Sequence, residues 1–265
     1  MCLKSKVKNL ILKTLLAVGP KNIPAAAILL YHNVGRDGAY LTTTPENFAA
    51  QMEFLRADYH VISLHDLVDH LIHGHPIKPR TVVLTFDDGF AGQYDFVFPI
   101  LRASHLPATF FVATGIVGKS LRLSSGHDLP VMGWEQIWEI GSVPHLEIAP
   151  HSVTHREFTR LPPDEIRREV RESSAAVAEK IGRTSRHFAY PRGKFSAKSA
   201  AILKEEGMEA AVAVRQGLTA AGDDLFLLRR NTIDSSVTDL KLFAARLGWP
   251  IKIMAKLLPR PSSPL

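Results

Sequence analysis

A short β-favouring run that ends in two adjacent carboxylates constrains this chain of 265 residues more than any other stretch. Residues 81–86, Thr-Val-Val-Leu-Thr-Phe, lead directly into Asp87, Asp88 and Gly89. An apolar run bounded by a turn signal predicts a buried strand. The two aspartates fall at its carboxyl end, where α/β folds place their catalytic groups. A turn that merely closes a strand is the alternative that this stretch alone leaves open.

The two carboxylates cannot share one role while the backbone stays extended, because successive side chains on a strand point to opposite sides. One carboxylate could bind a metal while the other stays free as a base. This pair therefore indicates a division of labour between Asp87 and Asp88.

A second stretch, from His151 to His155, places two imidazoles four residues apart after the apolar run 146–150. If the backbone turns helically there, both rings meet on one face, which is a spacing for metal ligands. Ser152 stands where the HExxH protease arrangement requires Glu, so that class is excluded. Combined with carboxylates at another strand end, the pair predicts a His-His-Asp site with open coordination positions.

Strand-like and helix-like segments alternate along the chain, which predicts a single-domain α/β fold, a distorted parallel barrel of seven or eight strands. We expect an N-terminal amphipathic, basic extension over 1–27, the barrel over 28–236, and a C-terminal helix and basic tail over 237–265. The Glu and Arg residues of the helix predicted over 163–181 are expected to form a solvated face. The expected strands are 28–34, 59–62, 81–86, 108–112, 146–150, 187–190, 210–214 and 226–228, with a helix over 94–105 and a loop over 115–132.

The TFDDG and HSxxH motifs resemble those of the polysaccharide deacetylases, the NodB-homology group of carbohydrate esterases (family 4). The resemblance extends from about residue 28 to 233, with the motifs in the order of the family. It implies that Asp87 is the general base and that Asp88, His151 and His155 bind the metal. Imidazole and carboxylate donors favour zinc, with cobalt, nickel or iron as alternatives.

His32 follows the apolar run 28–31 in the motif Leu-Leu-Tyr-His-Asn-Val. In the branch of the family that acts on poly-N-acetylglucosamine-like polymers, a similar N-terminal motif supplies the catalytic acid. No Leu-x-His stretch occurs late in this chain, where most other members carry that histidine. The resemblance therefore implies that His32 is the acid, with a purely structural histidine as the alternative.

Residues 187–193, His-Phe-Ala-Tyr-Pro-Arg-Gly, correspond to the third motif of the family. Ala189 stands where most members have an Arg that orients the base carboxylate. Arg229 or Arg230 could occupy the vacated space, and plain strand-end charges are the alternative. The resemblance also implies that the backbone N–H of Arg192 helps to hold the oxyanion. Substrate contacts are expected from three further residues: Trp134, Tyr190 and Pro191.

The charge pattern bears on partners and location. The net charge is +6, but no nucleic-acid-binding motif accompanies it, so no nucleic-acid partner is predicted. The lone cysteine excludes an internal disulfide framework. An interrupted apolar run near the start favours an uncleaved amphipathic helix over a signal peptide. Basic residues near both ends favour peripheral association with an anionic membrane, with mere solubilisation as the alternative. We therefore expect a cytoplasmic protein, or one at the inner membrane, rather than a periplasmic or secreted protein. The basic residues are Lys4, Lys6, Lys8, Lys13, Lys252, Lys256 and Arg260.

These patterns together predict a metal-dependent hydrolase that removes N-acetyl or O-acetyl groups from a polysaccharide or oligosaccharide. Deformylation or deacetylation of a lipid-linked sugar at the membrane face is the second enzymatic interpretation. A non-catalytic glycan-binding barrel is the interpretation from another functional class. The sequence leaves the oligomeric state open.

Overall fold

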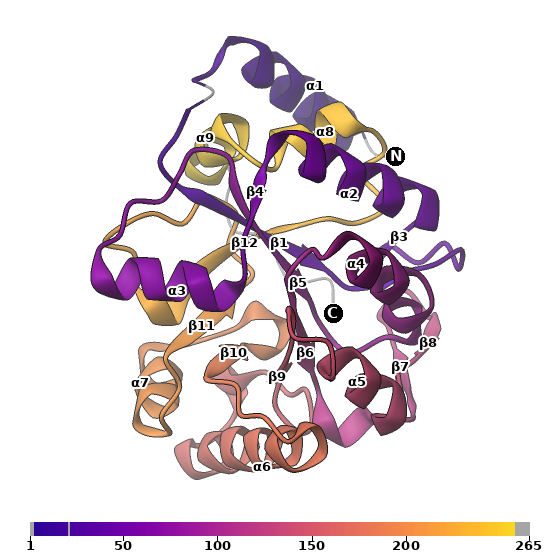
Figure 1. The fold of residues 1–265 in the computed structure, drawn as a ribbon, viewed down its shortest axis with the longest axis vertical. Helices are drawn as coiled ribbons and strands as arrows, with labels where there is room; N and C mark the ends of the chain where they lie inside the picture. Colours follow the sequence, from indigo (N-terminus) through magenta and orange to yellow (C-terminus); the bar gives the residue numbers. More distant parts are fainter. Residues whose placement is uncertain (1–2, 21, 258–265) are drawn as a thin grey trace.

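The computed structural model describes residues 3–20 and 22–257, and a parallel sheet curls through its centre (Figure 1). Every ladder of this sheet is parallel. The strand order is β10-β11-β12-β1-β5-β6-β9, with β4 beside β5, so the predicted distorted (β/α) barrel is confirmed. The strands are β1 (Ala26–Tyr31), β4 (His60–Val61), β5 (Thr81–Phe86), β6 (Ala108–Val112), β9 (Leu146–Pro150), β10 (His187–Ala189), β11 (Ala210–Ala213) and β12 (Leu228–Thr232).

Helices surround the sheet (Figure 1). Two of them begin as the sequence indicates: Thr44 caps α2 with Pro45 in the first turn, and Ser63 caps α3 in a capping box. The α-helices are α1 (Leu3–Val18), α2 (Pro45–Asp58), α3 (Leu64–His73), α4 (Phe98–Ser104), α5 (Trp134–Gly141), α6 (Pro163–Ile181), α7 (Ala197–Glu205), α8 (Leu240–Ala245) and α9 (Trp249–Leu257).

Strand residues alternate between two packing surfaces because the side-chain period of a strand is two. Val83 and Phe111 belong to the inner cluster of the barrel. Leu84 and Phe86 belong to the outer cluster, which packs against the helices. Asp87 continues the inner series by one further step, so the alternation of β5 directs its carboxylate towards the interior of the barrel.

Three segments differ from the sequence-based expectation. The helix expected over 94–105 begins as a π-helix, Gln93–Val97, before α4. The loop over 115–132 contains a hairpin of β7 (Ser120–Arg122) and β8 (Asp128–Pro130). Leucines and a valine of this segment pack on Phe90 in a small separate cluster, which explains why it is ordered. The last strand lies at 228–232 rather than 226–228, and this shift brings Arg230 into the sheet.

The first and last helices pack together, since α1 contacts both α8 and α9 (Figure 1). Leu12 is fully buried beside Ala245, and the Lys13 Nζ lies 2.8 Å from an Asp239 carboxylate oxygen. No helix in the described ranges is both long and apolar enough to span a bilayer. The side chains of Lys4, Lys6, Lys8 and Lys256, and all of Cys2 and Arg260, lie outside the described part of the chain.

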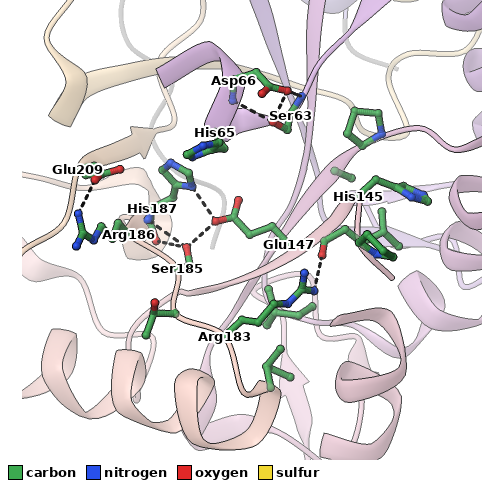
Figure 2. Close-up of a pocket in the computed structure, with 17 residues that line it drawn as sticks. Ser63, His65, Asp66, His145, Glu147, Arg183, Ser185, Arg186, His187 and Glu209 are labelled. Atoms are coloured by element: carbon green, nitrogen blue, oxygen red, sulfur yellow. Dashed lines mark hydrogen bonds and ion pairs between the residues drawn. The ribbon is translucent and has the colours of Figure 1, made fainter. Parts of the chain in front are cut away.

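The barrel has a seam between β9 and β10, which no backbone ladder joins in the described residues. Side chains bridge this seam at the amino ends of the strands (Figure 2). Glu147 Oε1 accepts hydrogen bonds from Ser185 Oγ at 2.7 Å and from His187 Nδ1 at 2.8 Å. Its Oε2 accepts from Thr109 Oγ1 at 2.8 Å. Glu147 on β9 therefore connects β6, β10 and the segment that leads into β10, at the place where no backbone ladder closes the barrel.

The Glu147–His187 pair makes this connection dependent on pH. Burial alone would lower the pKa of His187, but the Glu147 carboxylate outweighs it and raises the pKa above the ordinary 6.5. Burial would raise the pKa of Glu147, and His187 together with the two hydroxyls brings it below the ordinary 4.5. The stabilisation by His187 is lost as pH rises through its raised pKa, and that by Glu147 is lost as pH falls through its lowered pKa. Both contributions to stability are therefore fully present between pH 4.5 and pH 6.5.

Glu147→Gln is expected to lower the free energy of unfolding by about 1–3 kcal/mol between these pH values, because a partly buried charge-assisted bond is lost. The difference from wild type should shrink as pH rises further, which thermal unfolding over a pH series would measure. Glu46→Gln removes an exposed ion pair with Arg36 and is the control that should leave unfolding unchanged. A pH-independent effect of Glu147→Gln would contradict the ionic account.

Candidate metal centre and active site

The chain turns sharply at the end of β5, and this turn separates the two aspartates. Asp88 and Gly89 both have φ of 71°, a left-handed conformation that Asp tolerates better than most residues. The buried Gln93 side chain fixes the turn, because its Nε2 donates to the backbone carbonyls of Asp87 at 2.6 Å and of His32 at 2.7 Å. Asp87 and Asp88 therefore face different partners, as the motif predicts.

Arg230 holds the carboxylate of Asp87 from inside the barrel. Arg230 Nη1 and Nη2 each donate to one oxygen of Asp87 at 2.6 Å, and Nη1 also reaches Thr85 Oγ1 at 3.2 Å. The guanidinium is fully buried and lies 5.6 Å from the ring centre of Phe111. Arg230 thus makes the carboxylate contact expected from the Arg that Ala189 replaces, and the interpretation of Arg230 as a plain strand-end charge is wrong.

This contact sets the charge of Asp87. Burial alone would raise the pKa of Asp87, but Arg230, followed by His151, outweighs it and holds the pKa below its ordinary value. The carboxylate is therefore ionised and oriented at neutral pH, which are the two conditions that a general base must meet.

His151 and His155 meet beside Asp88, although the backbone between them is not helical as the spacing argument required. Ser152 and His155 have φ of 66° and 56°, so a tight loop replaces the expected helical turn. The two rings still lie 4.9 Å apart between centres. Asp88 Oδ1 is 3.5 Å from His151 Nε2 and 3.1 Å from His155 Nε2. The expected helical turn between the two histidines is therefore wrong, and this loop brings the two rings together instead.

These three residues fit a divalent metal ion. Their donor atoms all lie within 4.8 Å of one another, and the residues are buried. Both carboxylate oxygens of Asp88 and the Nε2 of His155 are buried without a hydrogen-bond partner. Buried polar atoms left without partners are costly, so a cation there would satisfy them. His151 Nδ1 donates to the Ala189 carbonyl at 2.7 Å, which directs its Nε2 towards Asp88, as metal-binding histidines require.

Glu169 on α6 organises the loop between the two histidines. Its Oε2 accepts from the backbone N–H groups of Val153 and Thr154, both at 2.8 Å, and its Oε1 accepts from Thr154 Oγ1 at 2.6 Å. The expectation that the acidic residues of this helix are solvated is wrong for Glu169, which is only 2 % exposed. Its place on the same helical stripe as Ile166, Val170 and Ser173 was a signal in the sequence that could have identified it.

His32 lies at the end of β1, next to the catalytic turn, since Asp87 N–H donates to the carbonyl of the preceding Tyr31 at 2.9 Å. The His32 side chain is buried, and its Nδ1 has no hydrogen-bond partner. Burial lowers the pKa of His32, and the attraction of Asp88 and Asp87 does not fully compensate. The structure therefore places His32 beside both aspartates, with a resting preference for the neutral imidazole.

The remaining predicted site residues lie on two elements. Arg192, with φ of 57°, lies in the 3₁₀ turn Pro191–Gly193 that follows β10 at the same end of the barrel as the aspartates. Tyr190 is fully buried among aromatic rings and Pro191 is also buried, so direct substrate contact by either stays a prediction. Trp134 begins α5 and is half-buried.

A parallel barrel that brings together two histidines, one aspartate able to hold a metal and a separate oriented carboxylate is the arrangement expected of a metal-dependent hydrolase. A sequence profile of the polysaccharide deacetylase family matches residues 74–211. The chain belongs to this family.

Individual relatives agree with this assignment. YxkH of Bacillus subtilis (strain 168) is 23% identical over 212 residues, which cover 80% of this chain and 71% of YxkH. A poly-β-1,6-N-acetyl-D-glucosamine N-deacetylase of Staphylococcus epidermidis is 25% identical over 173 residues, 63% of this chain and 60% of that enzyme. IcaB from Ammonifex degensii has a similar fold, with a TM-score of 0.75, 23% identity, and coverage of 84% of this chain and 98% of that chain.

Removing the Arg230 contact should impair catalysis without removing the metal. We expect Arg230→Met to lower kcat by about 10- to 100-fold, because Asp87 loses the group that orients and ionises it. Metal content by elemental analysis should stay at the wild-type level, since Arg230 contacts none of the three metal-binding candidates. Equal loss of metal and of activity would show that Arg230 supports the fold rather than the base.

Glu169→Gln is expected to weaken metal binding by about 10- to 100-fold, because the loop that carries both histidines loses its charged acceptor. Competition with a chelator of known affinity would measure this change. Glu172→Gln lies on the same helix at an exposed position and is the matched control, which should bind metal as wild type does. Wild-type affinity in Glu169→Gln would contradict the role given to Glu169.

Proposed function

We propose that this protein is a zinc-dependent N-deacetylase of a poly-N-acetylglucosamine-type glycan, and the name of its staphylococcal relative, a poly-β-1,6-N-acetyl-D-glucosamine N-deacetylase, supports this substrate. The observation that carries the proposal is the separation of the two aspartates. Asp87 is ionised and held by Arg230, whereas Asp88 faces two histidines and its oxygens have no hydrogen-bond partner. A non-catalytic glycan-binding barrel would not need an oriented base beside a metal centre.

Asp88, His151 and His155 would hold the ion, and this donor set favours zinc. Zinc, when bound, would supply Lewis-acid chemistry that polarises the acetyl carbonyl and lowers the pKa of water to about 7. Asp87 takes the proton of the attacking water. The backbone N–H of Arg192 is the proposed donor to the oxyanion.

His32 would deliver a proton to the departing sugar amine. Its lowered pKa favours the neutral imidazole at rest, so we propose that His32 is protonated during the cycle rather than before it. The proton that Asp87 removes from water is the available source. This sequence returns both groups to their resting states once the amine leaves.

The two aspartates should separate in a mutational test. Asp87→Asn is expected to retain one metal ion per chain and to lose turnover, whereas Asp88→Asn should lose both. Elemental analysis together with acetate release from a poly-N-acetylglucosamine substrate would measure the two properties. His155→Ala is the companion variant and should lose the metal. Near-normal turnover in Asp87→Asn, or full metal occupancy in His155→Ala, would contradict the assignment.

We also propose peripheral association with a membrane surface, as the basic and apolar ends of the chain suggest. Leu10 is 67% exposed and Ile11 is 42% exposed on α1, and Leu240 is 40% exposed on α8, which packs against α1. Large apolar side chains exposed on two helices that pack together favour a position at a membrane–water interface.

The double variant Leu10→Glu, Ile11→Glu should reduce sedimentation with anionic lipid vesicles several-fold, because the apolar face then carries charge. Ile72→Glu changes a similarly exposed apolar residue on α3 and should not alter sedimentation. A double variant that binds vesicles as wild type does would exclude this face. Deletion of residues 1–20 is the less specific test, since Leu12 is buried against α8.

A further inference from the structure

Helix α5 carries two tryptophans one turn apart beside an open groove on the flank of the barrel. Trp138 is 55% exposed, more than any other large aromatic side chain in the described residues. The groove has a volume of about 470 Å³. It is lined by Trp134, Glu135, Trp138, Glu139 and Lys180. None of the catalytic or metal-binding candidates lines it, and Trp134 is the one expected substrate contact that does.

The groove starts close to the catalytic turn. Met132 N–H donates to the carbonyl of Gly89 at 2.9 Å, and Gly89 directly follows Asp88. Trp134 is two residues beyond Met132, a distance of at most about 7 Å along the chain. A polymer that passes through the active site could therefore reach the groove with neighbouring sugar units.

The unpaired charge of the groove is negative. In the described residues, Glu135 has no ion pair and no side-chain hydrogen bond. Glu139 Oε2 accepts from Tyr94 Oη at 2.5 Å, and its Oε1 lies 3.8 Å from Arg102. The one cation lining the groove, Lys180, is already paired with Glu179 at 2.9 Å. The groove thus presents a free carboxylate next to two indole rings.

These features fit the product of the proposed reaction better than its substrate. Removal of an acetyl group leaves a primary amine that is protonated near neutral pH, whereas the acetylated sugar is uncharged. An ammonium group is attracted to the face of an indole and to a carboxylate. The apolar C–H face of a pyranose ring can lie against the exposed surface of Trp138.

We propose that the Trp134–Trp138 groove binds deacetylated, glucosamine-containing stretches of the glycan chain. The proposal rests on the proposed function for the identity of the glycan. It assigns to the groove a product-retention role: the enzyme stays on a polymer that it has begun to deacetylate.

The test is the binding of a glucosamine hexamer to the full chain by titration calorimetry, with the fully acetylated hexamer for comparison. Wild type should bind the glucosamine hexamer more tightly. Trp138→Ala should weaken this binding at least tenfold, and Glu135→Gln should weaken it and reduce its salt dependence. Phe96→Ala and Glu172→Gln change an exposed aromatic and an exposed carboxylate elsewhere and should bind as wild type does.

Acetate release from a short acetylated oligomer should be unchanged in Trp138→Ala, since Trp138 is neither a catalytic or metal-binding candidate nor a predicted substrate contact. Equal binding of the two hexamers by wild type, or wild-type binding by Trp138→Ala, would overturn the proposal. Because the hexamer of glucosamine carries no acetyl group, its binding is measured independently of turnover. A chain that fails to release acetate but binds this ligand through Trp138 would overturn the proposed function and leave the groove assignment standing.

Discussion

The buried ion pair between Asp87 and Arg230 is the interaction on which the rest of the site depends. Two charges in the interior of a barrel are costly to desolvate, and removing one partner of such a pair typically costs about 3–5 kcal/mol. Arg230 binds both oxygens of Asp87 from inside the barrel. The left-handed turn at Asp88 directs the Asp88 carboxylate towards the two histidines. One aspartate is thereby an oriented carboxylate held by Arg230, and the other faces two histidines.

The seam between β9 and β10 links the stability of the barrel to the candidate metal centre. At the amino ends of these strands, Glu147 bridges to His187. At the carboxyl ends, His151 donates to the Ala189 carbonyl across the same gap. A side-chain hydrogen bond of His151 therefore substitutes for a missing ladder hydrogen bond. Loss of the Glu147–His187 contact would loosen β10, and β10 carries the Ala189 carbonyl that orients His151.

The sequence was sufficient for the parts of the site that local patterns encode. The TFDDG and HSxxH motifs identified the residues that come together, and the alternation of segments predicted the barrel. Arg230 could not be chosen over Arg229, because its partner lies 143 residues away and the choice depends on strand register. Glu169 was missed because its charge suggested solvent, whereas its position on the buried stripe of α6 decides its contacts. The left-handed loop at His155 likewise results from long-range hydrogen bonds, not from local propensity.

The most direct test of this account is anomalous diffraction at the zinc edge from crystals of the zinc-loaded protein. The account predicts one strong peak, bounded by a carboxylate oxygen of Asp88 and by the Nε2 atoms of His151 and His155. Asp87 should remain on Arg230 and outside the coordination sphere of the ion. A peak coordinated by Asp87, or no peak at the three residues despite bound zinc elsewhere, would contradict the separation of base and metal ligand.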